Sequence, residues 1–305
     1  MAKTRKWPRV GVVGAGAVGG YFGGLMAHAG AQVVMIGRRS FVEAVRSNGL
    51  LLDTFHFRER VHVEASTDLS AIRGVDLALF CVKTTDNGAT ARELASFLTP
   101  DTTVISLQNG VDNVEQIRTA AHIEALPAAV YVAASVPEPG SVRHVARGDL
   151  VVGPESQPFA EHFVAAGIPC RVSDNIEGEL WTKLLWNCAL NAISALGKAR
   201  YGRIAESFDA RNLVEEVVNE VLAVARAAQV VLPGLEDPKA GMAGAMKIAT
   251  EMAGALSSTA QDINRGKRTE IASLNGFIAR RGGMLGVPTP MNQALFTLVK
   301  LAEDR

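Results

Sequence analysis

The chain of 305 residues is longer than most single hydrophobic cores, so we expect two domains. Apolar residues make up 48% and charged residues 20% of it, which is ordinary for a protein with a large buried core and excludes a disordered chain. Because 31 Lys and Arg residues balance 31 Asp and Glu residues, no net charge favours nucleic acid, an anionic membrane or an acidic partner.

The three cysteines, Cys81, Cys170 and Cys188, are odd in number and far apart in the sequence. Reduced thiols in a cytoplasmic protein are the simplest account, since a buried free cysteine is commonly a small apolar side chain rather than a catalytic thiol. The six histidines show neither the i, i+4 pairing of a helical metal site nor neighbouring cysteines. We therefore predict a cytoplasmic protein without a bound metal.

Residues 10–36 carry no charge and follow the basic residues 3–6, a pattern that imitates a signal peptide or a membrane span. The same run contains eight glycines. It divides into a β-branched segment, a glycine turn, an apolar helical segment and a second β-branched segment. This order predicts a β-α-β unit buried within the protein rather than a membrane segment.

The first β-α-β unit has the sequence of a dinucleotide-binding site. A strand over residues 9–13 leads into a Gly-x-Gly-x-x-Gly turn, and a helix over 18–30 and a strand over 31–36 follow. The three glycines permit a tight turn, close approach of a pyrophosphate and close packing of helix on strand. We expect the phosphates at the helix N-terminus; a glycine turn that binds nothing is the alternative. The turn consists of Gly14, Ala15, Gly16, Ala17, Val18 and Gly19.

The end of the second strand indicates which dinucleotide is bound. An acidic residue there binds the ribose 2′-hydroxyl of NAD, whereas a basic residue accommodates the 2′-phosphate of NADP. In this chain Arg38 and Arg39 follow the strand, and the first acid is Glu43. The sequence favours NADPH, with charged residues on a solvated loop as the alternative.

Two further strands end in polar residues. The runs 75–82 and 102–107 are nearly continuous apolar sequence, as expected for strands covered on both faces of a parallel sheet. Lys83 and Asn109 follow them, and ligands of such sheets bind beyond the carboxyl ends of the strands. Both residues therefore are candidates to contact cofactor or substrate. A solvated lysine and a turn formed by Asn109 and Gly110 are the alternatives.

The remainder of the first half is β-rich and then changes character. Turn-forming residues at 137–140 and 147–149 predict antiparallel hairpins that close the sheet, with His144 as an exposed cross-strand residue. A helix over 154–166 and a short strand over 169–172 follow. Together with the first unit they predict an α/β fold class.

We expect an N-terminal Rossmann-type doubly wound sheet that binds NADP(H) over residues 1–174. An all-α domain that binds the substrate and carries the catalytic groups should follow over residues 175–305.

The first helix of the second half carries one polar stripe. Lys183, Asn187 and Asn191 are spaced by four, while nearly every other residue of 184–196 is apolar. A helix that is apolar nearly all round is buried, and buried polar side chains need partners. We expect the stripe to face a polar cavity and to orient an oxygen-rich small molecule. A solvent face is the alternative, although asparagine is a poor helix former.

Beyond this helix the local patterns are weaker. The segments 211–231 and 238–255 predict helices that serve packing only. Ser258 precedes a charged stretch that ends at Thr269 and Glu270. Thr269 is placed to cap a helix that begins at Glu270, which would make that carboxylate a first-turn charge, and a catalytic role is the alternative.

The order and spacing of these motifs resemble the ketopantoate reductase (2-dehydropantoate 2-reductase) family over essentially the whole chain. The resemblance implies NADPH-dependent reduction of 2-dehydropantoate to pantoate, a step in the biosynthesis of pantothenate and coenzyme A. It rests on the glycine turn, the strand-end residues Arg38, Lys83 and Asn109-Gly110, the segment Glu179-Leu180-Trp181-x-Lys183-x3-Asn187-x3-Asn191, and the later motifs Ser257-Ser258-x2-Gln261-Asp262, Thr269-Glu270-Ile271 and Asn275-Gly276-Phe277.

The resemblance also implies roles in catalysis and in substrate binding. Lys183 would be the general acid and Glu270 its active-site partner. The substrate would be held by Asn187, Asn191 and Ser258.

On the cofactor side, the resemblance implies that Arg38 binds the 2′-phosphate and that Lys83 and Asn109 contact the cofactor and the reacting centre. The chain departs from the family in two places. Ala192 stands where a proline is frequent, and Tyr201 lies near the position of a third substrate-binding asparagine. These departures leave the specificity of the pocket open.

Two other functions remain alternatives. One is a related NADPH-dependent reductase of another 2-oxo acid, which the departure at Tyr201 keeps open. The other is a non-catalytic NADPH-binding regulatory protein, for which damage to Lys183 or Glu270 would be expected, and both residues are present. The expected partners are a small 2-oxo acid and, where the chain associates, a second copy in a homodimer; no nucleic acid or membrane partner is expected.

Overall fold

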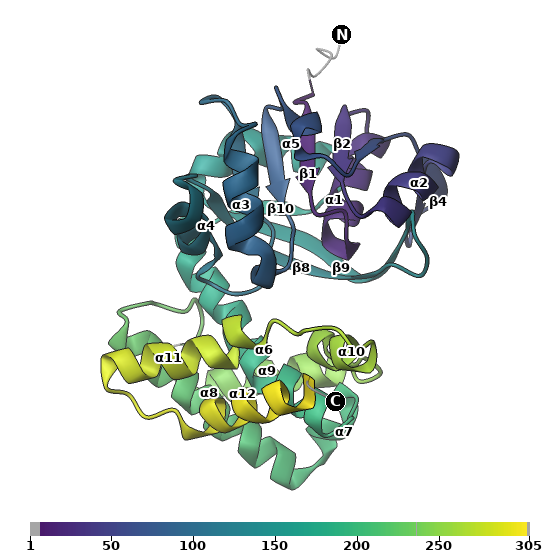
Figure 1. The fold of residues 1–305 in the computed structure, drawn as a ribbon. Coiled ribbons are helices and arrows are strands. Elements are labelled where there is room, and N and C mark those ends of the chain that lie inside the picture. Colours follow the sequence, from purple (N-terminus) through teal and green to yellow (C-terminus); the bar gives the residue numbers. More distant parts are fainter. Residues whose placement is uncertain (1–6, 236, 304–305) are drawn as a thin grey trace. The chain divides into compact units, whose positions relative to one another are not determined.

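The computed structural model describes residues 7–235 and 237–303, so the basic residues 3–6 lie outside the described part. The chain forms two compact units, drawn in Figure 1. The first runs to Gln108 and continues over Asp112–Ile176, and the second consists of Asn109–Val111 and the chain from Glu177 onward. The first unit is an α/β structure around a largely parallel sheet and the second is helical, which confirms the predicted fold class.

The parallel half of the sheet in the first unit follows the predicted apolar runs. β1 pairs in parallel with β2 on one side and with β6 on the other, so the strand order reverses beside β1. All residues of these three strands are buried. The strands of this half are β1 (Val10–Val13), β2 (Val33–Ile36), β5 (Glu64–Ser66), β6 (Leu77–Phe80) and β7 (Thr103–Ser106), in the order β5-β2-β1-β6-β7. Such a reversal is where open α/β sheets bind ligands.

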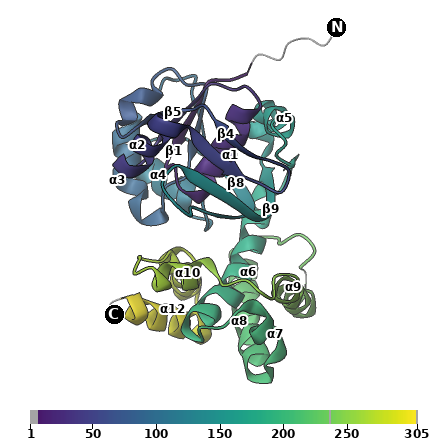
Figure 2. The same cartoon turned by 90° about the vertical axis from the view of Figure 1, so that its right-hand side faces the viewer.

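The other half of the sheet continues from β7 through a long hairpin, seen side on in Figure 2. The hairpin pairs β8 and β9 in antiparallel fashion, which confirms the predicted antiparallel closure of the sheet. β3 then pairs in parallel with β9, and β4 pairs antiparallel with β3. The strands of this half are β8 (Leu126–Ser135), β9 (Ser141–Val152), β10 (Cys170–Val172), β3 (Leu50–Asp53) and β4 (Arg58–Val61).

The predicted turn at residues 147–149 is wrong, because β9 runs straight through it with a bulge. Tyr131 faces Asp149 and Val132 faces Arg147, so Gly148 is the extra residue. Gly148 has a φ of 137°, and a Cβ on it would lie 2.4 Å from the Tyr21 hydroxyl oxygen. The glycine therefore marks a close approach of helix α1 (Ala17–His28) to the sheet rather than a chain reversal.

His144 is half-buried rather than exposed, which corrects the expectation for this residue. Its ring lies 4.6 Å from the ring of Tyr21 and 4.5 Å from that of Phe55. The side chain of Phe55 comes from the turn between β3 and β4, so His144 is part of an aromatic cluster that joins this turn to α1.

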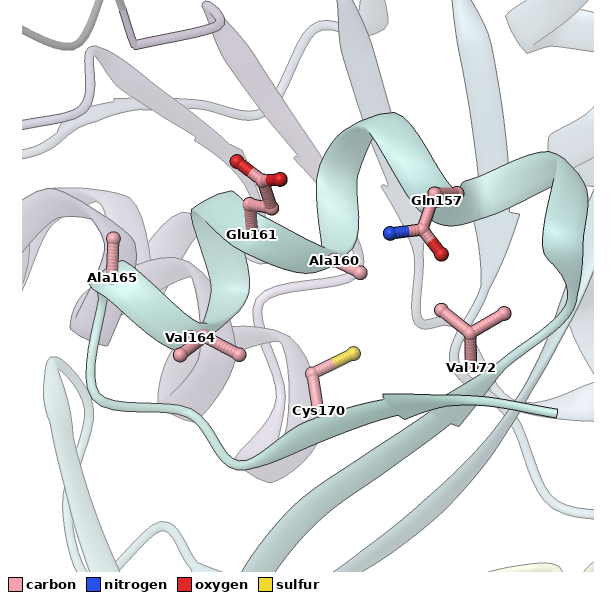
Figure 3. A pocket seen from close by; sticks show the side chains of 7 residues that line it. All are labelled: Gln157, Ala160, Glu161, Val164, Ala165, Cys170 and Val172. Carbon is pink, nitrogen blue, oxygen red and sulfur yellow. The ribbon is translucent and has the colours of Figure 1, made fainter.

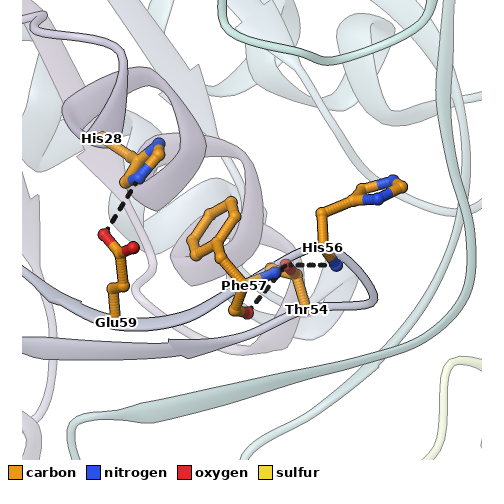
Figure 4. A network of polar contacts seen from close by, with 5 residues as sticks. All are labelled: His28, Thr54, His56, Phe57 and Glu59. Carbon is orange, nitrogen blue, oxygen red and sulfur yellow. Dashed lines mark hydrogen bonds and ion pairs between the residues drawn. The ribbon is translucent and has the colours of Figure 1, made fainter.

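The β3-β4 hairpin is one of several elements that the sequence did not predict. Figure 4 shows how its turn is closed by Thr54, whose hydroxyl donates to the Phe57 carbonyl at 2.9 Å and accepts from the backbone N–H groups of His56 and Phe57. The Phe57 ring stacks on His28 of α1 at 4.1 Å, and Glu59 pairs with the same histidine at 3.3 Å. Contacts with α1 and β9 thus stabilise a hairpin whose own strands are only four residues long.

Helix α1 lies between the two halves of the sheet and uses glycines on two faces. A Cβ on Gly19 or Gly23 would come within 2.7 Å of Val12 on β1. On the other face, a Cβ on Gly20 or Gly24 would lie 2.7 Å from side chains of β9 and β3. Two pairs of adjacent glycines, one helical turn apart, therefore let α1 pack closely against both halves of the sheet at once.

The other face of the parallel strands is covered by α3 (Asn87–Ala95) and α4 (Asn113–Ala121), which pack side by side in Figure 1. Helix α2 (Arg39–Asn48), which the sequence did not predict, follows β2. The predicted helix at 154–166 is confirmed as a 3₁₀ turn, Pro154–Ser156, followed by α5 (Gln157–Ala165).

The second unit is built around α6, the predicted helix that is apolar nearly all round. Its residues 188–195 are all buried. The predicted helices at 211–231 and 238–255 are confirmed as α8 and α9, each ending about four residues earlier than expected. In the described parts of the chain, none of the helices has the length and apolar character needed to cross a membrane. The helices are α6 (Ile176–Leu196), α7 (Tyr201–Glu206), α8 (Phe208–Ala227), α9 (Pro238–Glu251), α10 (Ser258–Asn264), α11 (Asn275–Leu285) and α12 (Pro290–Glu303).

A buried carboxylate joins α8 to the start of α12. Glu220 accepts hydrogen bonds from the backbone N–H groups of Met291 and Asn292 at 2.7 and 2.9 Å and from the Asn292 amide at 2.8 Å. These N–H groups belong to the first turn of α12, where a negative charge is favoured by the helix dipole. Asn292 in turn accepts from Asn275, which also donates to the Cys188 carbonyl of α6.

The packing of α1 predicts different losses of stability for two glycines of the same turn. Gly19→Ala should lower the free energy of unfolding by about 2–3 kcal/mol, because its Cβ would lie 2.3 Å from the Gly14 carbonyl oxygen, and a backbone atom moves little. Gly16→Ala should cost less than about 1 kcal/mol, because no described atom lies within 4 Å of its Cβ. Urea unfolding followed by circular dichroism measures both, and equal losses would contradict this account of the helix.

Candidate functional site

The glycine turn of the first unit presents open backbone at the start of α1. Gly14 has a φ of 102°, and the N–H groups of Gly14 and Ala15 both bond to the Ile36 carbonyl, which fixes the turn to the end of β2. Helix α1 begins after Gly16, with no acidic residue in its first turn and no cap from a described side chain. The space beside Gly16 and the N–H groups at this helix end fit a pyrophosphate.

A second helix begins beside this turn with positive charge. Arg38 is the N-cap residue of α2 and Arg39 its first residue, both exposed, and no described side chain caps the helix. A Cβ on the neighbouring Gly37 would lie 3.2 Å from the Ala15 Cβ, so the two loops are adjacent. Two guanidinium groups at a helix N-terminus without an acidic first turn provide a local site for an anion such as a phosphate.

Lys83 is half-buried at the end of β6, where a network of amides that the sequence did not predict supports it. Gln108 donates to the carbonyl of Val82 at 2.7 Å and to Asn87 Oδ1 at 2.6 Å. Ser106 donates to Gln108 Oε1, and Asn87 donates to Asn113 and Gln116. The network holds the residue before Lys83 between the ends of β6 and β7. Its only sequence signal is the presence of amides next to buried strands.

In the second unit, Asn109 and Glu270 lie together although 161 residues separate them in the sequence. The Asn109 amide donates to Glu270 Oε2 at 3.1 Å, and both side chains are half-buried. The loop that follows β7 and the segment before α11 thus bring an amide donor and a carboxylate into contact.

The segment around Glu270 differs from the helix start that the local sequence suggested. Glu270 precedes a 3₁₀ turn, Ile271–Ser273, and the Thr269 hydroxyl accepts from the backbone N–H of Ile271. The carboxylate of Glu303 on α12 accepts from both the backbone N–H and the hydroxyl of Thr269. The end of α12 therefore holds the residue next to Glu270, and the carboxylate of Glu270 is not a first-turn helix charge.

The polar stripe of α6 is not an open solvent face along its whole length. Lys183 and Asn187 are half-buried and only 3% of Asn191 is exposed, so burial increases along the stripe toward Asn191. Asn191 contacts Ser258 at the start of α10, with 3.5 Å between the Asn191 Nδ2 and Ser258 Oγ atoms. Two of the three predicted substrate residues are thereby adjacent across 67 residues of sequence.

Tyr201, noted in the sequence as a departure, contacts the same asparagine. Its hydroxyl donates to Asn191 Oδ1 at 2.9 Å, and its side chain is buried. Ala192, the other departure, is fully buried among the apolar residues of α6. The sequence identified Tyr201 as unusual, but its partner follows only from the fold.

None of the three cysteines is set up as a reactive thiol, including Cys170, which lines a cavity of the first unit. All three cysteines are free, and burial raises the pKa of each thiol, that of Cys170 to about 11. Figure 3 shows Cys170 in a cavity of about 330 Å³ between α5 and β10, lined mostly by apolar side chains with Gln157 and Glu161. Among the described residues no group of three or more His, Cys, Asp or Glu side chains is arranged to hold a metal ion.

Comparison with known proteins identifies relatives along almost the whole chain. The family model described as Ketopantoate reductase PanE/ApbA matches residues 10–157, and the model of the C-terminal part of that family matches residues 175–303. The chain is 30% identical over 305 aligned residues to the 2-dehydropantoate 2-reductase of Pyrococcus horikoshii, which covers 97% of this chain and 98% of that protein.

Solved structures give the same result. A PanE/ApbA family ketopantoate reductase from Ralstonia eutropha JMP134 is 46% identical with a TM-score of 0.91, covering 97% of this chain and 98% of that one. D-mandelate dehydrogenase, solved with NADH and anilino(oxo)acetate, has a TM-score of 0.90 at 24% identity, with 97% and 98% covered. At that identity the second likeness shows a shared fold.

The contact between Glu303 and Thr269 predicts a pH-dependent contribution to stability. Burial raises the pKa of Glu303, but hydrogen bonds from Lys300 and Thr269 outweigh it and hold the pKa below its usual value. A carboxylate whose pKa is lower in the folded than in the unfolded protein stabilises the fold at pH values above its unfolded pKa of about 4.3. This stabilisation is lost as the pH falls through the folded-state pKa. Glu303→Gln should therefore be less stable than the wild type at pH 7, and the difference should shrink below pH 4.

Urea unfolding followed by the fluorescence of Trp181 and Trp186, both in the second unit, measures this difference. Glu251→Gln is the matched control, because Glu251 is exposed and its carboxylate lies 3.9 Å from Lys247. A stability difference for Glu303→Gln that stays constant from pH 7 to pH 3 would rule out the proposed linkage.

Proposed function

Because the chain belongs to the ketopantoate reductase family, we propose that it reduces 2-dehydropantoate to pantoate with NADPH, in the biosynthesis of pantothenate and coenzyme A. The chain is an oxidoreductase of that family. The observation that most supports the finer proposal is the meeting of Asn109 with Glu270 and of Asn191 with Ser258, since these residues have no sequence proximity. In this proposal the domain of residues 1–174 binds the cofactor and that of residues 175–305 binds the substrate.

Two helix ends of the first unit support a dinucleotide with an extra phosphate. The open backbone at Gly16 and the start of α1 suit the pyrophosphate that all nicotinamide dinucleotides share. Arg38 and Arg39 at the start of α2 suit the 2′-phosphate that only NADPH carries. Lys83 and Asn109, which follow β6 and β7, are proposed to contact the cofactor near the reacting centre.

The residues proposed to transfer the proton lie in the second unit. NADPH, when bound, supplies a hydride to C2 of the 2-oxo acid. Lys183 donates a hydrogen bond to the carbonyl oxygen, on which negative charge develops, and then transfers a proton to it. Glu270 is the acidic partner of the lysine in the site, and its own carboxylate is oriented by Asn109. Asn187, Asn191 and Ser258 hold the substrate, with amide and hydroxyl groups suited to carboxylate and hydroxyl oxygens.

A second candidate function is the reduction of another 2-oxo acid. The observation in its favour is Tyr201, which bonds to Asn191 and lies near the position where the family resemblance implies a third substrate-binding asparagine. D-mandelate dehydrogenase, with the same fold, was solved with an oxoacetate that carries an aromatic substituent. Assays with a panel of 2-oxo acids, followed by the absorbance of the reduced nicotinamide, decide between the two functions.

The role of Lys183 predicts a large loss of turnover without loss of cofactor binding. Lys183→Ala should lower kcat by about 10²–10⁴-fold, because that is the usual contribution of a positioned general acid. Its dissociation constant for NADPH, measured by fluorescence titration, should stay close to that of the wild type. Lys247→Ala, at an exposed lysine of α9, is the control. A Lys183→Ala variant that retains most of its turnover would remove this lysine from the mechanism.

The role of Arg38 predicts a change of cofactor preference. Arg38→Ala should raise the KM for NADPH by about 10- to 100-fold, since a charge-assisted contact with phosphate contributes about 1.5–3 kcal/mol. The KM for NADH should change by less than about threefold. Gly16→Ala is the matched comparison, because it should weaken both cofactors alike by crowding the shared pyrophosphate. Equal losses with both cofactors in Arg38→Ala would mean that the 2′-phosphate binds elsewhere.

A further inference from the structure

Tyr201 is a buried tyrosine whose hydroxyl has a specific partner in the proposed substrate site. It stands at the first position of α7, with its hydroxyl 2.9 Å from Asn191 Oδ1. Among the hydrogen bonds of the described residues, Asn191 is the acceptor found for that hydroxyl. Burial raises the pKa of Tyr201, so the phenol keeps its proton and remains a donor.

This contact determines which way the Asn191 carboxamide points. If the carboxamide were turned over, its NH₂ group would donate to the tyrosine, and the phenol proton would be buried without an acceptor. The observed arrangement satisfies the phenol proton with Oδ1 and directs the NH₂ group toward Ser258. At 3.5 Å the contact with Ser258 is long, so the NH₂ group retains donor capacity for a ligand.

The backbone around both residues is held by further hydrogen bonds, which fix the positions from which the two side chains extend. The N–H groups of Tyr201 and Gly202 donate to the carbonyls of Ala255 and Ala253 at 3.0 Å, which docks the start of α7 on the turn after α9. The hydroxyl of Ser257, which follows that turn, donates to the Asn191 carbonyl at 3.0 Å. The turn after α9 thus joins α7 to α6 at the two residues concerned.

We propose that Tyr201 is a positioning residue that locks the Asn191 carboxamide with its NH₂ group toward Ser258, so that Asn191 presents a hydrogen-bond donor to the substrate. The proposal rests on the proposed function and specifies what this asparagine recognises. A fixed NH₂ group binds an acceptor oxygen, such as a carboxylate or carbonyl oxygen, which every 2-oxo acid has. The Oδ1 atom faces Tyr201 on the other side of the carboxamide, so a substrate oxygen beside Ser258 meets the NH₂ group rather than Oδ1.

The kinetic test is Tyr201→Phe, which removes the hydroxyl and keeps the ring that fills the core. Without the lock the carboxamide turns freely, so the KM for the 2-oxo acid should rise by about tenfold while kcat changes by less than about threefold. The rise should be the same for 2-dehydropantoate and for a 2-oxo acid with the same branched carbon and no hydroxyl. A rise confined to the hydroxylated substrate would overturn the proposal, because Asn191 would then recognise the hydroxyl.

Two comparisons separate positioning from a general loss of stability. Tyr201→Phe in an Asn191→Ala background should cause no further rise in KM, because the hydroxyl acts through that asparagine. Tyr131→Phe removes the same atom from a tyrosine of β8 and should leave the KM unchanged. A lower Tm for Tyr201→Phe with an unchanged KM would reduce the hydroxyl to a structural role and overturn the proposal.

A readout that needs no turnover tests the lock itself. The two side-chain amide protons of Asn191, assigned in a ¹⁵N-correlated spectrum by their loss in Asn191→Ala, should shift and exchange faster with solvent in Tyr201→Phe. Unchanged signals would overturn the proposal whether or not the protein reduces any 2-oxo acid. If the signals respond as expected but no 2-oxo acid is reduced by the wild type, the lock stands and the proposed function fails.

Discussion

The structure of the first unit depends on the close packing of one glycine-rich helix between two halves of a sheet. Four glycines of α1 at positions 19, 20, 23 and 24 let β1 approach one face and β3 and β9 the other. Only three residues separate the end of β1 from the start of α1, and the backbone of this short turn at Gly16 is open. Open N–H groups at a helix end are the feature that an anionic cofactor needs, so the first glycines that pack this helix and the candidate binding site lie at the same end of α1.

The second unit depends on a different constraint, the burial of polar groups on α6. A helix without a solvent face must give each polar side chain a partner from another element. Ser194 donates to the Ala199 carbonyl, and Asn191 is held between Tyr201 and Ser258. These bonds join α6 to α7 and α10, so the groups proposed to bind substrate also specify how the helices pack. A substitution at such a position is expected to alter both specificity and stability, which is why readouts that separate the two are needed.

The sequence predicted what depends on local pattern and missed what depends on tertiary contacts. The parallel strands and the long buried helix have strong apolar runs, and each glycine of the turn has a known physical role. The strands β3 and β4 of the hairpin are four residues long, and three residues of β4 are exposed. The structure of this hairpin therefore depends on the pairing of β3 with β9. Gly148 resembled a turn because the approach of Tyr21 is invisible in the sequence. The contacts of Asn87 with Gln108 and of Asn109 with Glu270 join segments whose local sequences contain no signal for each other.

Membership of the family constrains the reaction more than the substrate, and the donors and acceptors of the second unit show why. In the proposed function the Lys183 ammonium is a donor only, and an Asn191 held by Tyr201 turns its NH₂ group toward the substrate, so both favour the oxygens of the 2-oxo acid group itself. Asn187 and Ser258 each carry a donor and an acceptor, so in the same proposal they are the residues that match a hydroxyl on the rest of the molecule. In the proposed function, discrimination between 2-dehydropantoate and an unhydroxylated relative therefore depends on these two residues, because a site rejects a missing hydroxyl only where a polar group would be left unpaired.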